Sequence, residues 1–172
     1  MSGQRSRFDD WPTLELGNVR RMRVLGAVIP NAQMAESMVD APFERVWSWF
    51  SDLERSVPAF DGQVRRLHVR RRDGDQLKMV SWQGPGGALP MPFDVLLERN
   101  GWCLMTSPAR LYVVGMCADP VGDNQTHVAV LEAMPRRLGR LVVSSLGRHV
   151  RGDVLRIGRA LAVNARPIDS PR

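Results

Sequence analysis

The sequence predicts an α+β domain with a seven-stranded antiparallel sheet and a long C-terminal helix. Three observations indicate this class: two short helical patterns follow a first strand, six further strand patterns run in succession, and a long apolar helical stripe comes last. With 172 residues the chain fits one domain with short additional segments. Its 44% hydrophobic content is enough for a core.

The first strand and the two short helices are predicted between residues 32 and 60. Residues 32–39 have a strand pattern, Asp40 can cap the helix that follows, and Pro42 lies near the first helical position, where a missing N–H costs nothing. Residues 53–60 predict the second short helix. The first helix has one apolar stripe at helical spacing, formed by Phe43, Val46, Trp47 and Phe50.

The six later strands are separated by turn sequences. Asp73-Gly74 and Asn100-Gly101 supply the positive φ angles of tight hairpin turns, and a Pro-Val-Gly-Asp-Asn turn begins at residue 120. The predicted strands span residues 64–72, 76–83, 91–99, 102–106, 111–118 and 126–134.

The facing of the strands is predicted from the lengths of these turns. A two-residue loop at Asn100-Gly101 would pair Arg99 with Trp102. Because side chains alternate between faces, the inward face would then carry Met91, Phe93, Val95, Leu97, Trp102 and Leu104. For the Asp73-Gly74 hairpin the sequence leaves two arrangements open. Leu67 and Val69 share a face of the sheet either with Leu77 and Met79 or with Val80 and Trp82.

Residues 138–162 predict a long helix that covers one face of the sheet. His149 and Asp153 flank its apolar stripe, and Arg148 and Arg159 lie opposite. The stripe residues fall within about ±40° of one another at 100° per residue, and they are Val143, Leu146, Val150, Val154, Ile157 and Leu161.

The positive charge of the chain is concentrated at its end. The net charge is +6, and residues 136–172 contain nine arginines and two aspartates. An Arg-rich C-terminal helix fits docking on an anionic membrane surface. Specific nucleic-acid binding is not expected, because neither a recognition helix nor an aromatic stacking platform is visible.

No cofactor, metal site or disulfide framework is expected. Cys103 and Cys117 are the only cysteines and lack metal-type spacing. No run approaches the ~20 apolar residues of a membrane span, and the apolar core within residues 20–35 is too short and broken for a signal peptide. A cytoplasmic location is therefore expected.

Residues 39–60, "VDAPFERVWSWFSDLERSVPAF", resemble the helix-helix signature of the START/Bet v1-like (SRPBCC) superfamily, especially its polyketide cyclase/dehydrase and lipid-transport branch. The resemblance covers roughly residues 32–164. It implies the helix-grip fold, in which a curved sheet grips the long helix around a hydrophobic cavity. Members bind lipids, sterols, polyketides or hormones. The sequence departs from this pattern at "SWQGPGGALPMPF" (81–93), where a flexible loop is expected near the cavity mouth.

The resemblance divides the chain into an N-terminal extension (1–30), a helix-grip domain (31–166) and a disordered tail (167–172). It implies binding or transport of a hydrophobic small molecule in the cavity. We expect the cavity to be lined by Trp47, Phe50, Leu67, Val69, Met79, Met91, Phe93, Val95, Leu97, Trp102, Leu104, Tyr112, Leu146, His149 and Val150.

Two alternative functions remain open. One is a polyketide cyclase/aromatase-type enzyme, in which His149 acts as the acid or base. Asp153, four residues further along the helix, would orient its ring, and Tyr112 would hydrogen-bond a ligand carbonyl. Glu132 is a further acidic candidate, but its strand phase is undecided. The other alternative is an interaction module whose pocket is filled by its own side chains.

Overall fold

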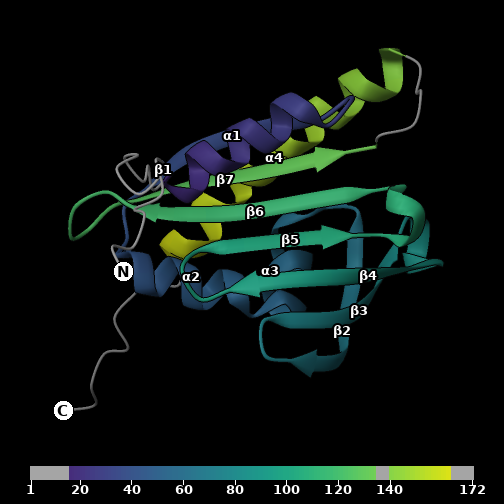
Figure 1. Ribbon diagram of the computed structural model, residues 1–172, viewed down its shortest axis with the longest axis horizontal. Helices are drawn as coiled ribbons and strands as arrows, with labels where there is room; N and C mark the ends of the chain where they lie inside the picture. Colours follow the sequence, from purple (N-terminus) through teal and green to yellow (C-terminus); the bar gives the residue numbers. More distant parts are fainter. Residues whose placement is uncertain (1–15, 135–139, 164–172) are drawn as a thin grey trace, which may run out of the picture.

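One antiparallel sheet organises the part of the chain that the structure describes, residues 16–134 and 140–163. In this computed structural model the helices are α1 (Asn18–Val28), α2 (Phe43–Ser51), α3 (Leu53–Phe60) and α4 (Arg140–Val163) (Figure 1). The strands are β1 (Gln33–Val39), β2 (Val64–Asp73), β3 (Gln76–Gln83), β4 (Leu89–Glu98), β5 (Trp102–Thr106), β6 (Val113–Pro120) and β7 (Thr126–Ala133). Short 3-10 turns span Pro85–Gly87 and Pro108–Arg110.

The strand order is β1-β7-β6-β5-β4-β3-β2, and every neighbouring pair is antiparallel. Strands β2 to β7 follow one another as a meander, while β1 pairs with β7 and forms the opposite edge. Helices α2 and α3 connect the two edge strands. The predicted class, a helix-grip α+β fold with a curved seven-stranded sheet and a long C-terminal helix, is confirmed. The helix and strand bounds lie within two residues of the predicted ones, apart from the unpredicted α1.

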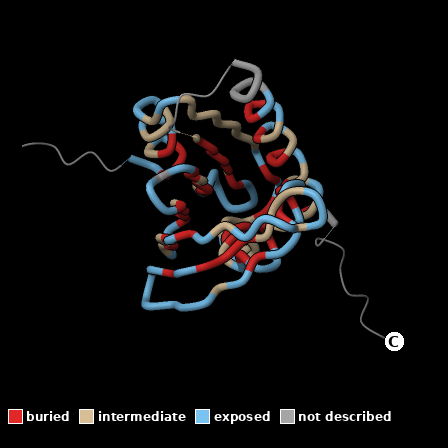
Figure 2. The backbone as a smooth tube through the Cα atoms, turned by 90° about the vertical axis from the view of Figure 1, so that its right-hand side faces the viewer, coloured by how far each residue is buried: buried red, intermediate tan, exposed pale blue. Residues whose placement is uncertain are grey.

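The concave face of the sheet packs against α2, α3 and α4 and forms the main core. Buried positions gather where the sheet meets these helices, and the peripheral loops are exposed (Figure 2). The predicted stripe of α4 is buried from Leu146 to Leu161. The side chain of Val143, also predicted for this stripe, lies outside the described residues. Trp47 and Phe50 from α2 are buried in the same core, with their rings 6.2 Å apart.

A second core lies on the convex face, where α1 packs over β6 and β7. Val19 and Met22 of α1 are buried there against strand residues such as Cys117 and Leu131. Because α1 covers this face, the inner strands are apolar on both sides. Residues 1–30 were expected to form a partly ordered extension without clear periodicity, so the helix over Asn18–Val28 was not predicted.

Helix α1 is fixed at its N-terminus by an aspartate from β6. The Asp119 carboxylate accepts hydrogen bonds from the backbone N–H groups of Asn18 (2.7 Å) and Val19 (2.8 Å). These N–H groups have no partner inside the helix, and a negative charge at this end also favours the helix dipole. The Asn18 side chain donates to the Ala118 and Asn100 carbonyl oxygens.

The predicted register of the β4–β5 hairpin is wrong by one residue. Glu98 pairs with Trp102, and Leu97 pairs with Cys103, so the loop has three residues rather than two. A one-residue change moves every side chain of a strand to the other face. Trp102 and Leu104 therefore lie on the convex side with α1, whereas Cys103 and Met105 face the main core.

Of the two arrangements predicted for the β2–β3 hairpin, the structure has the one in which Leu77 and Met79 share a face with Leu67 and Val69. Val69 pairs with Met79, and Leu67 shares the buried concave face with both residues. Bulges interrupt β2 after Val64 and after Val69. The segment between β3 and β4 spans residues 84–88, two residues fewer than the predicted strands left between them, because β4 already begins at Leu89.

Replacing Gly101 by alanine should destabilise the protein strongly. Gly101 has a φ of +100°, and a Cβ atom there would lie 2.3 Å from the Ala118 carbonyl oxygen. Gly74 is the matched control, because it also has a positive φ (+58°) but nothing lies within 4 Å of its Cβ position. Gly74→Ala should cost about 1 kcal/mol of unfolding free energy from backbone strain. Gly101→Ala should cost clearly more in urea denaturation, and equal costs would contradict the close packing.

Replacing Asp119 by alanine should loosen α1. The change removes the hydrogen-bond acceptor for two helix N–H groups, and such caps contribute about 0.5–2 kcal/mol. Asp123→Ala, in the exposed turn that follows β6, is the control and should change little. Hydrogen exchange of the α1 amides should increase in the Asp119 variant alone. Unchanged protection of α1 would show that the cap does not hold it.

Candidate functional site

A cluster of ionisable side chains lies inside the concave face, between α4 and the sheet. Asp61 directly follows α3, Tyr112 precedes β6, and Glu132 lies on β7. Three further members come from α4, and they are His149, Asp153 and Arg156. Glu132 and Asp153 are almost fully buried, with 1% and 0% of their surface exposed. Burying charged groups is costly unless they are paired, so their contacts determine what the cluster can do.

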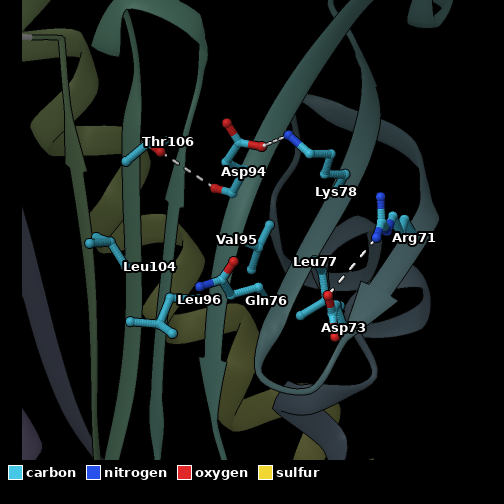
Figure 3. Close-up of a pocket in the computed structure, with 10 residues that line it drawn as sticks. All are labelled: Arg71, Asp73, Gln76, Leu77, Lys78, Asp94, Val95, Leu96, Leu104 and Thr106. Atoms are coloured by element: carbon cyan, nitrogen blue, oxygen red, sulfur yellow. Dashed lines mark hydrogen bonds and ion pairs between the residues drawn. The ribbon is translucent and has the colours of Figure 1, made fainter.

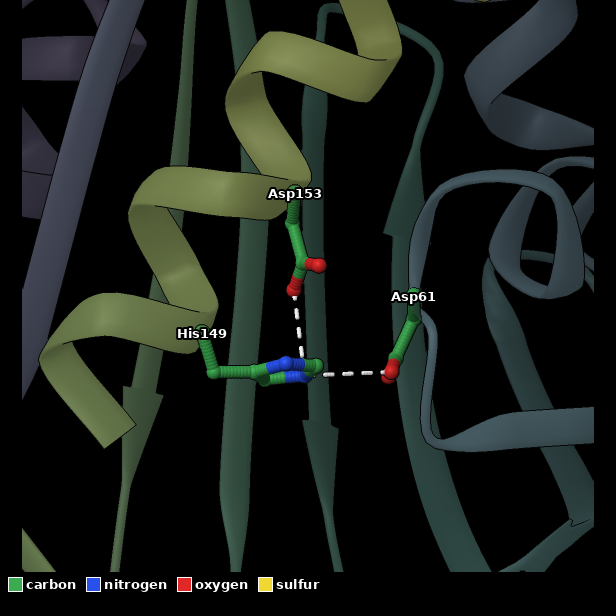
Figure 4. Close-up of side chains that lie close together, drawn as sticks. All are labelled: Asp61, His149 and Asp153. Atoms are coloured by element: carbon green, nitrogen blue, oxygen red, sulfur yellow. Dashed lines mark hydrogen bonds and ion pairs between the residues drawn. The ribbon is translucent and has the colours of Figure 1, made fainter. Parts of the chain in front are cut away.

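The imidazole of His149 is the centre of the cluster. Its Nε2 atom lies 3.1 Å from Asp61 Oδ1, 3.2 Å from Asp153 Oδ2 and 3.6 Å from Glu132 Oε1. Figure 4 shows the ring pointing from α4 towards Asp61, with Asp153 one turn further along the helix. Spacing of i,i+4 in a helix places the His149 and Asp153 side chains on the same side, as the sequence predicted.

The other oxygen atoms of the buried carboxylates are held by separate partners. The Tyr112 hydroxyl donates a hydrogen bond of 2.7 Å to Glu132 Oε2. Arg156 donates to Asp153 Oδ1 and also to the Phe60 carbonyl oxygen at the end of α3. These contacts fix the orientation of both carboxylates and leave Glu132 Oε1 and Asp153 Oδ2 facing His149.

The surroundings change the proton affinities of the cluster. The hydrogen bond to the Asp61 carboxylate raises the pKa of His149 to about 9. Burial raises the pKa of Glu132 to about 7 and that of Asp153 to about 7. Burial also raises the pKa of Tyr112 well above its usual range, so the phenol stays protonated as a donor. The cluster therefore holds protons more tightly than the same groups do in water.

Apolar side chains surround the cluster on the concave face. The Phe93 and Tyr112 rings lie 6.2 Å apart, and Met79, Met105 and Met116 are buried in the same core. Methionine side chains adapt to irregular shapes. The interior therefore combines adaptable apolar walls with one cluster that contains all the buried carboxylates of the described residues.

Hollows at the surface lie away from this cluster. One of about 470 Å³ lies on β2 to β5, where the Lys78–Asp94 ion pair and Leu96 and Leu104 line it (Figure 3). Helix α4 passes behind these strands, so this hollow opens on the convex side. Hollows of about 280 Å³ and 250 Å³ each reach predicted cavity residues, the first Trp47 and Leu97 and the second Met79 and Phe93.

Most of the predicted cavity residues share the concave core. The structure brings together Trp47, Phe50, Leu67, Val69, Met79, Met91, Phe93, Val95, Leu97, Tyr112, Leu146 and Val150, with His149 at their edge. Trp102 and Leu104 do not belong to this group, because the register places them against α1 or on the convex surface. Contact of any of these residues with a ligand stays a prediction.

The sequence did not single out Asp61 or Arg156, and it left Glu132 undecided. Asp61 was visible only as part of the turn that ends α3. Its side chain accepts a hydrogen bond from the Gln63 N–H, as aspartates often do in turns. Arg156 was counted among the basic residues of α4, yet its guanidinium turns inward to Asp153.

The Arg156 side chain remains 42% exposed, so it still borders the basic surface predicted for α4. Arg148, Arg151 and Arg159 are exposed, and the arginines at 136, 137, 166 and 172 lie outside the described residues. Membrane docking through this helix stays a prediction, as does the tail at 167–172, which also lies outside the described residues. Among the described helices, none is long and apolar enough to cross a membrane.

The sequence matches no protein-family model and no curated protein. Solved structures do match. The protein TTHA0849 from Thermus thermophilus has a TM-score of 0.64 at 18% identity, covering 78% of this chain and 99% of that one. The Zhui aromatase/cyclase from Streptomyces sp. R1128 has a TM-score of 0.64 at 10% identity, covering 81% and 98%.

A START superfamily protein from Mycobacterium smegmatis has a TM-score of 0.58 at 16% identity, covering 78% of this chain and 99% of that one. At such identities the likeness concerns the fold. The chain has the START/Bet v1-like helix-grip fold that its sequence predicted.

Proposed function

We propose that the concave interior binds a small amphipathic molecule, with its apolar part against the sheet and a polar group at the His149 cluster. One observation carries this proposal: among the residues that the structure describes, the buried carboxylates all belong to one oriented cluster in a largely apolar interior. Ligand sites commonly combine apolar walls with a few placed polar groups. Proteins with this fold include START and aromatase/cyclase proteins, which is compatible with a hydrophobic ligand.

The carboxylate oxygens that face His149 indicate which polar group the ligand carries. Glu132 Oε1 and Asp153 Oδ2 are acceptors whose companion oxygens are already hydrogen-bonded. A hydroxyl group donates to such acceptors, whereas a carboxylate on the ligand would be repelled by the three carboxylates of the cluster. The ligand class is therefore a hydroxylated apolar molecule, such as a sterol or a phenolic polyketide.

Binding requires side chains of the core to move. Phe50, Met116 and Val150 are fully buried, and the interior is filled by such groups. The methionines of the concave face can change rotamer at little cost, because they are unbranched and flexible. Bulges in β2 and the glycine-rich turn after β3 place irregular backbone along this edge of the sheet.

The direct test is native mass spectrometry of protein purified from its host, followed by extraction with organic solvent. We expect one apolar, hydroxyl-bearing molecule per chain. Met105→Trp should replace a flexible side chain by a larger rigid one that cannot make way for a ligand, and reduce the bound fraction about tenfold, equivalent to ~1.4 kcal/mol of affinity. Leu104→Trp, on the adjacent residue of the same strand but the other face, should leave loading unchanged.

Two results would contradict this function. Wild-type protein that is empty as purified and stays empty after incubation with sterols and phenolic polyketides does not bind this class. Equal loss of ligand in the Met105 and Leu104 variants would place the ligand elsewhere. Thermal melting of both variants checks that each remains folded, because overpacking a core costs about 1–3 kcal/mol.

Acid–base catalysis on the bound molecule is a second candidate, favoured by the contacts that connect Tyr112, Glu132 and His149. A phenol, a carboxylate and an imidazole in contact can donate and accept protons at one point. Such chemistry fits a cyclisation or aromatisation, as the fold of the Zhui aromatase/cyclase suggests.

This candidate predicts that His149→Ala slows turnover of a linear aromatic-polyketide precursor while the variant still binds it. General acid–base catalysis contributes about 10²–10⁴-fold, so kcat should fall by that factor. His127→Ala, which alters a histidine on the convex side beside Glu36, should retain wild-type kcat. Unchanged turnover in the His149 variant rules out its catalytic role but not ligand binding.

A further inference from the structure

The atoms that face each other in the cluster have the arrangement of a metal site. Asp61, His149 and Asp153 each offer one ligand atom, and these atoms lie within 4.8 Å of one another. Nε2 of His149 is 3.1 Å from the Asp61 oxygen and 3.2 Å from the Asp153 oxygen. The residues come from the end of α3 and from two successive turns of α4 (Figure 4).

A buried oxygen without a hydrogen bond points into this arrangement. Asp153 is 0% exposed, and its Oδ2 atom accepts no hydrogen bond from the residues that the structure describes. It lies within ion-pair distance of His149, but the hydrogen bond of that ring goes to Asp61. Leaving a buried acceptor unsatisfied costs about 1–3 kcal/mol, so a group that binds this oxygen would be favoured.

A proton on His149 cannot satisfy all the oxygens around it. Nε2 carries at most one N–H, whereas oxygens of Asp61, Asp153 and Glu132 lie at 3.1, 3.2 and 3.6 Å from it. A cation between Nε2 and the two aspartate oxygens would contact both, with the neutral imidazole donating its Nε2 lone pair. Arg156 already holds the companion oxygen of Asp153, which is the usual way in which outer partners orient metal ligands.

The separations between these atoms suit a small four-coordinate ion. Bonds of about 2.0–2.1 Å from Zn²⁺ to nitrogen or oxygen place tetrahedral ligand atoms about 3.3 Å apart. The distances from Nε2 to the Asp61 and Asp153 oxygens, 3.1 and 3.2 Å, are close to this value. One imidazole with carboxylates suits first-row ions such as Zn²⁺ or Mn²⁺, whereas Ca²⁺ and Mg²⁺ prefer oxygen ligands alone.

The charges of the cluster are also complementary to a divalent ion. Asp61, Asp153 and Glu132 supply three negative charges when ionised, and Arg156 supplies one positive charge. A divalent cation with neutral His149 would make the buried group electrically neutral. The His149 side chain is 12% exposed and that of Asp61 is 9% exposed, so the site borders the surface and an ion can reach it.

We infer that Asp61, His149 and Asp153 bind a divalent transition-metal ion, for which Zn²⁺ is the probe, with the fourth coordination position open to water or a ligand group. The inference does not depend on the proposed small-molecule ligand. The sequence indicated no metal site, because its ligands come from separate elements and not from closely spaced cysteines or histidines.

The test is calorimetric titration of Zn²⁺ into wild-type protein that has been dialysed against EDTA. We expect one saturable site per chain with a micromolar or tighter dissociation constant. Co²⁺ in place of Zn²⁺ should give the intense visible absorption of a four-coordinate site. Zn²⁺ should also raise the melting temperature, because a ligand that binds only the folded state stabilises it.

Histidine variants locate the ion. His149→Asn should weaken Zn²⁺ binding at least about tenfold, since loss of even an outer partner has that effect. His127→Asn is the matched control, because His127 also lies 2.9 Å from one carboxylate, Glu36, but has no second carboxylate partner among the described residues. It should bind Zn²⁺ like the wild type. Asp153→Asn should behave like His149→Asn.

Two outcomes overturn the inference. One is the absence of stoichiometric Zn²⁺ binding by folded wild-type protein. The other is equal weakening in the His149 and His127 variants, which would indicate adventitious binding by surface histidines. Because His149 borders the surface, its variant should fold even if Asp153→Asn does not, and circular dichroism checks this. Neither outcome bears on retention of an apolar ligand, which native mass spectrometry measures separately.

Discussion

Pairing of buried charges determines how α4 sits on the sheet. The apolar stripe of α4 stabilises the packing, but apolar contact is non-directional and would tolerate small shifts along the helix. The contacts of His149 with Asp61 and of Arg156 with the Phe60 carbonyl are directional, and they connect α4 to the end of α3. Glu132 and Tyr112 extend the same network to β7 and β6. A shifted helix would leave these charges buried and unpaired, at a cost of several kcal/mol.

The same network makes the interior chemically specific. Helix-grip folds host carriers and enzymes, so the fold alone does not decide the activity, and the decision lies with the groups that face the interior. Here those groups are two carboxylate oxygens and one imidazole nitrogen, held in place by Arg156 and Tyr112. A hydroxyl group and a metal ion are alternative ways to satisfy these atoms. An ion with protein ligands on one side would also leave room for a polar ligand group on its inner side.

The local patterns of the sequence predicted the elements well, and the errors arose where long-range contacts decide. Asp73-Gly74 and Asn100-Gly101 marked both hairpins. The β4–β5 loop nevertheless has three residues, because Asn100 does not adopt the positive φ that an Asn-Gly two-residue turn requires, whereas Gly101 does and packs closely on the Ala118 carbonyl. The contact with Ala118 lies beyond the hairpin, and the resulting register places Trp102 and Leu104 on the convex face. Helix α1 was not predicted, because the exposed apolar residues Val24 and Val28 obscure the helical spacing of the buried residues Val19 and Met22.

The candidate site was predictable only in part, for a related reason. His149 and Asp153 lie four residues apart on one helix, so periodicity alone brought them together. Glu132 follows Val128 and Val130 on one face of β7, while Ala129 and Leu131 occupy the other face. Both faces of β7 are apolar, because α1 covers one and α4 the other. The alternation of apolar and polar residues therefore could not show which face carries Glu132. Had α1 been recognised, the smaller Ala129 and Ala133 could have been assigned to the side that a close-packed helix covers, and Glu132 would then point at His149.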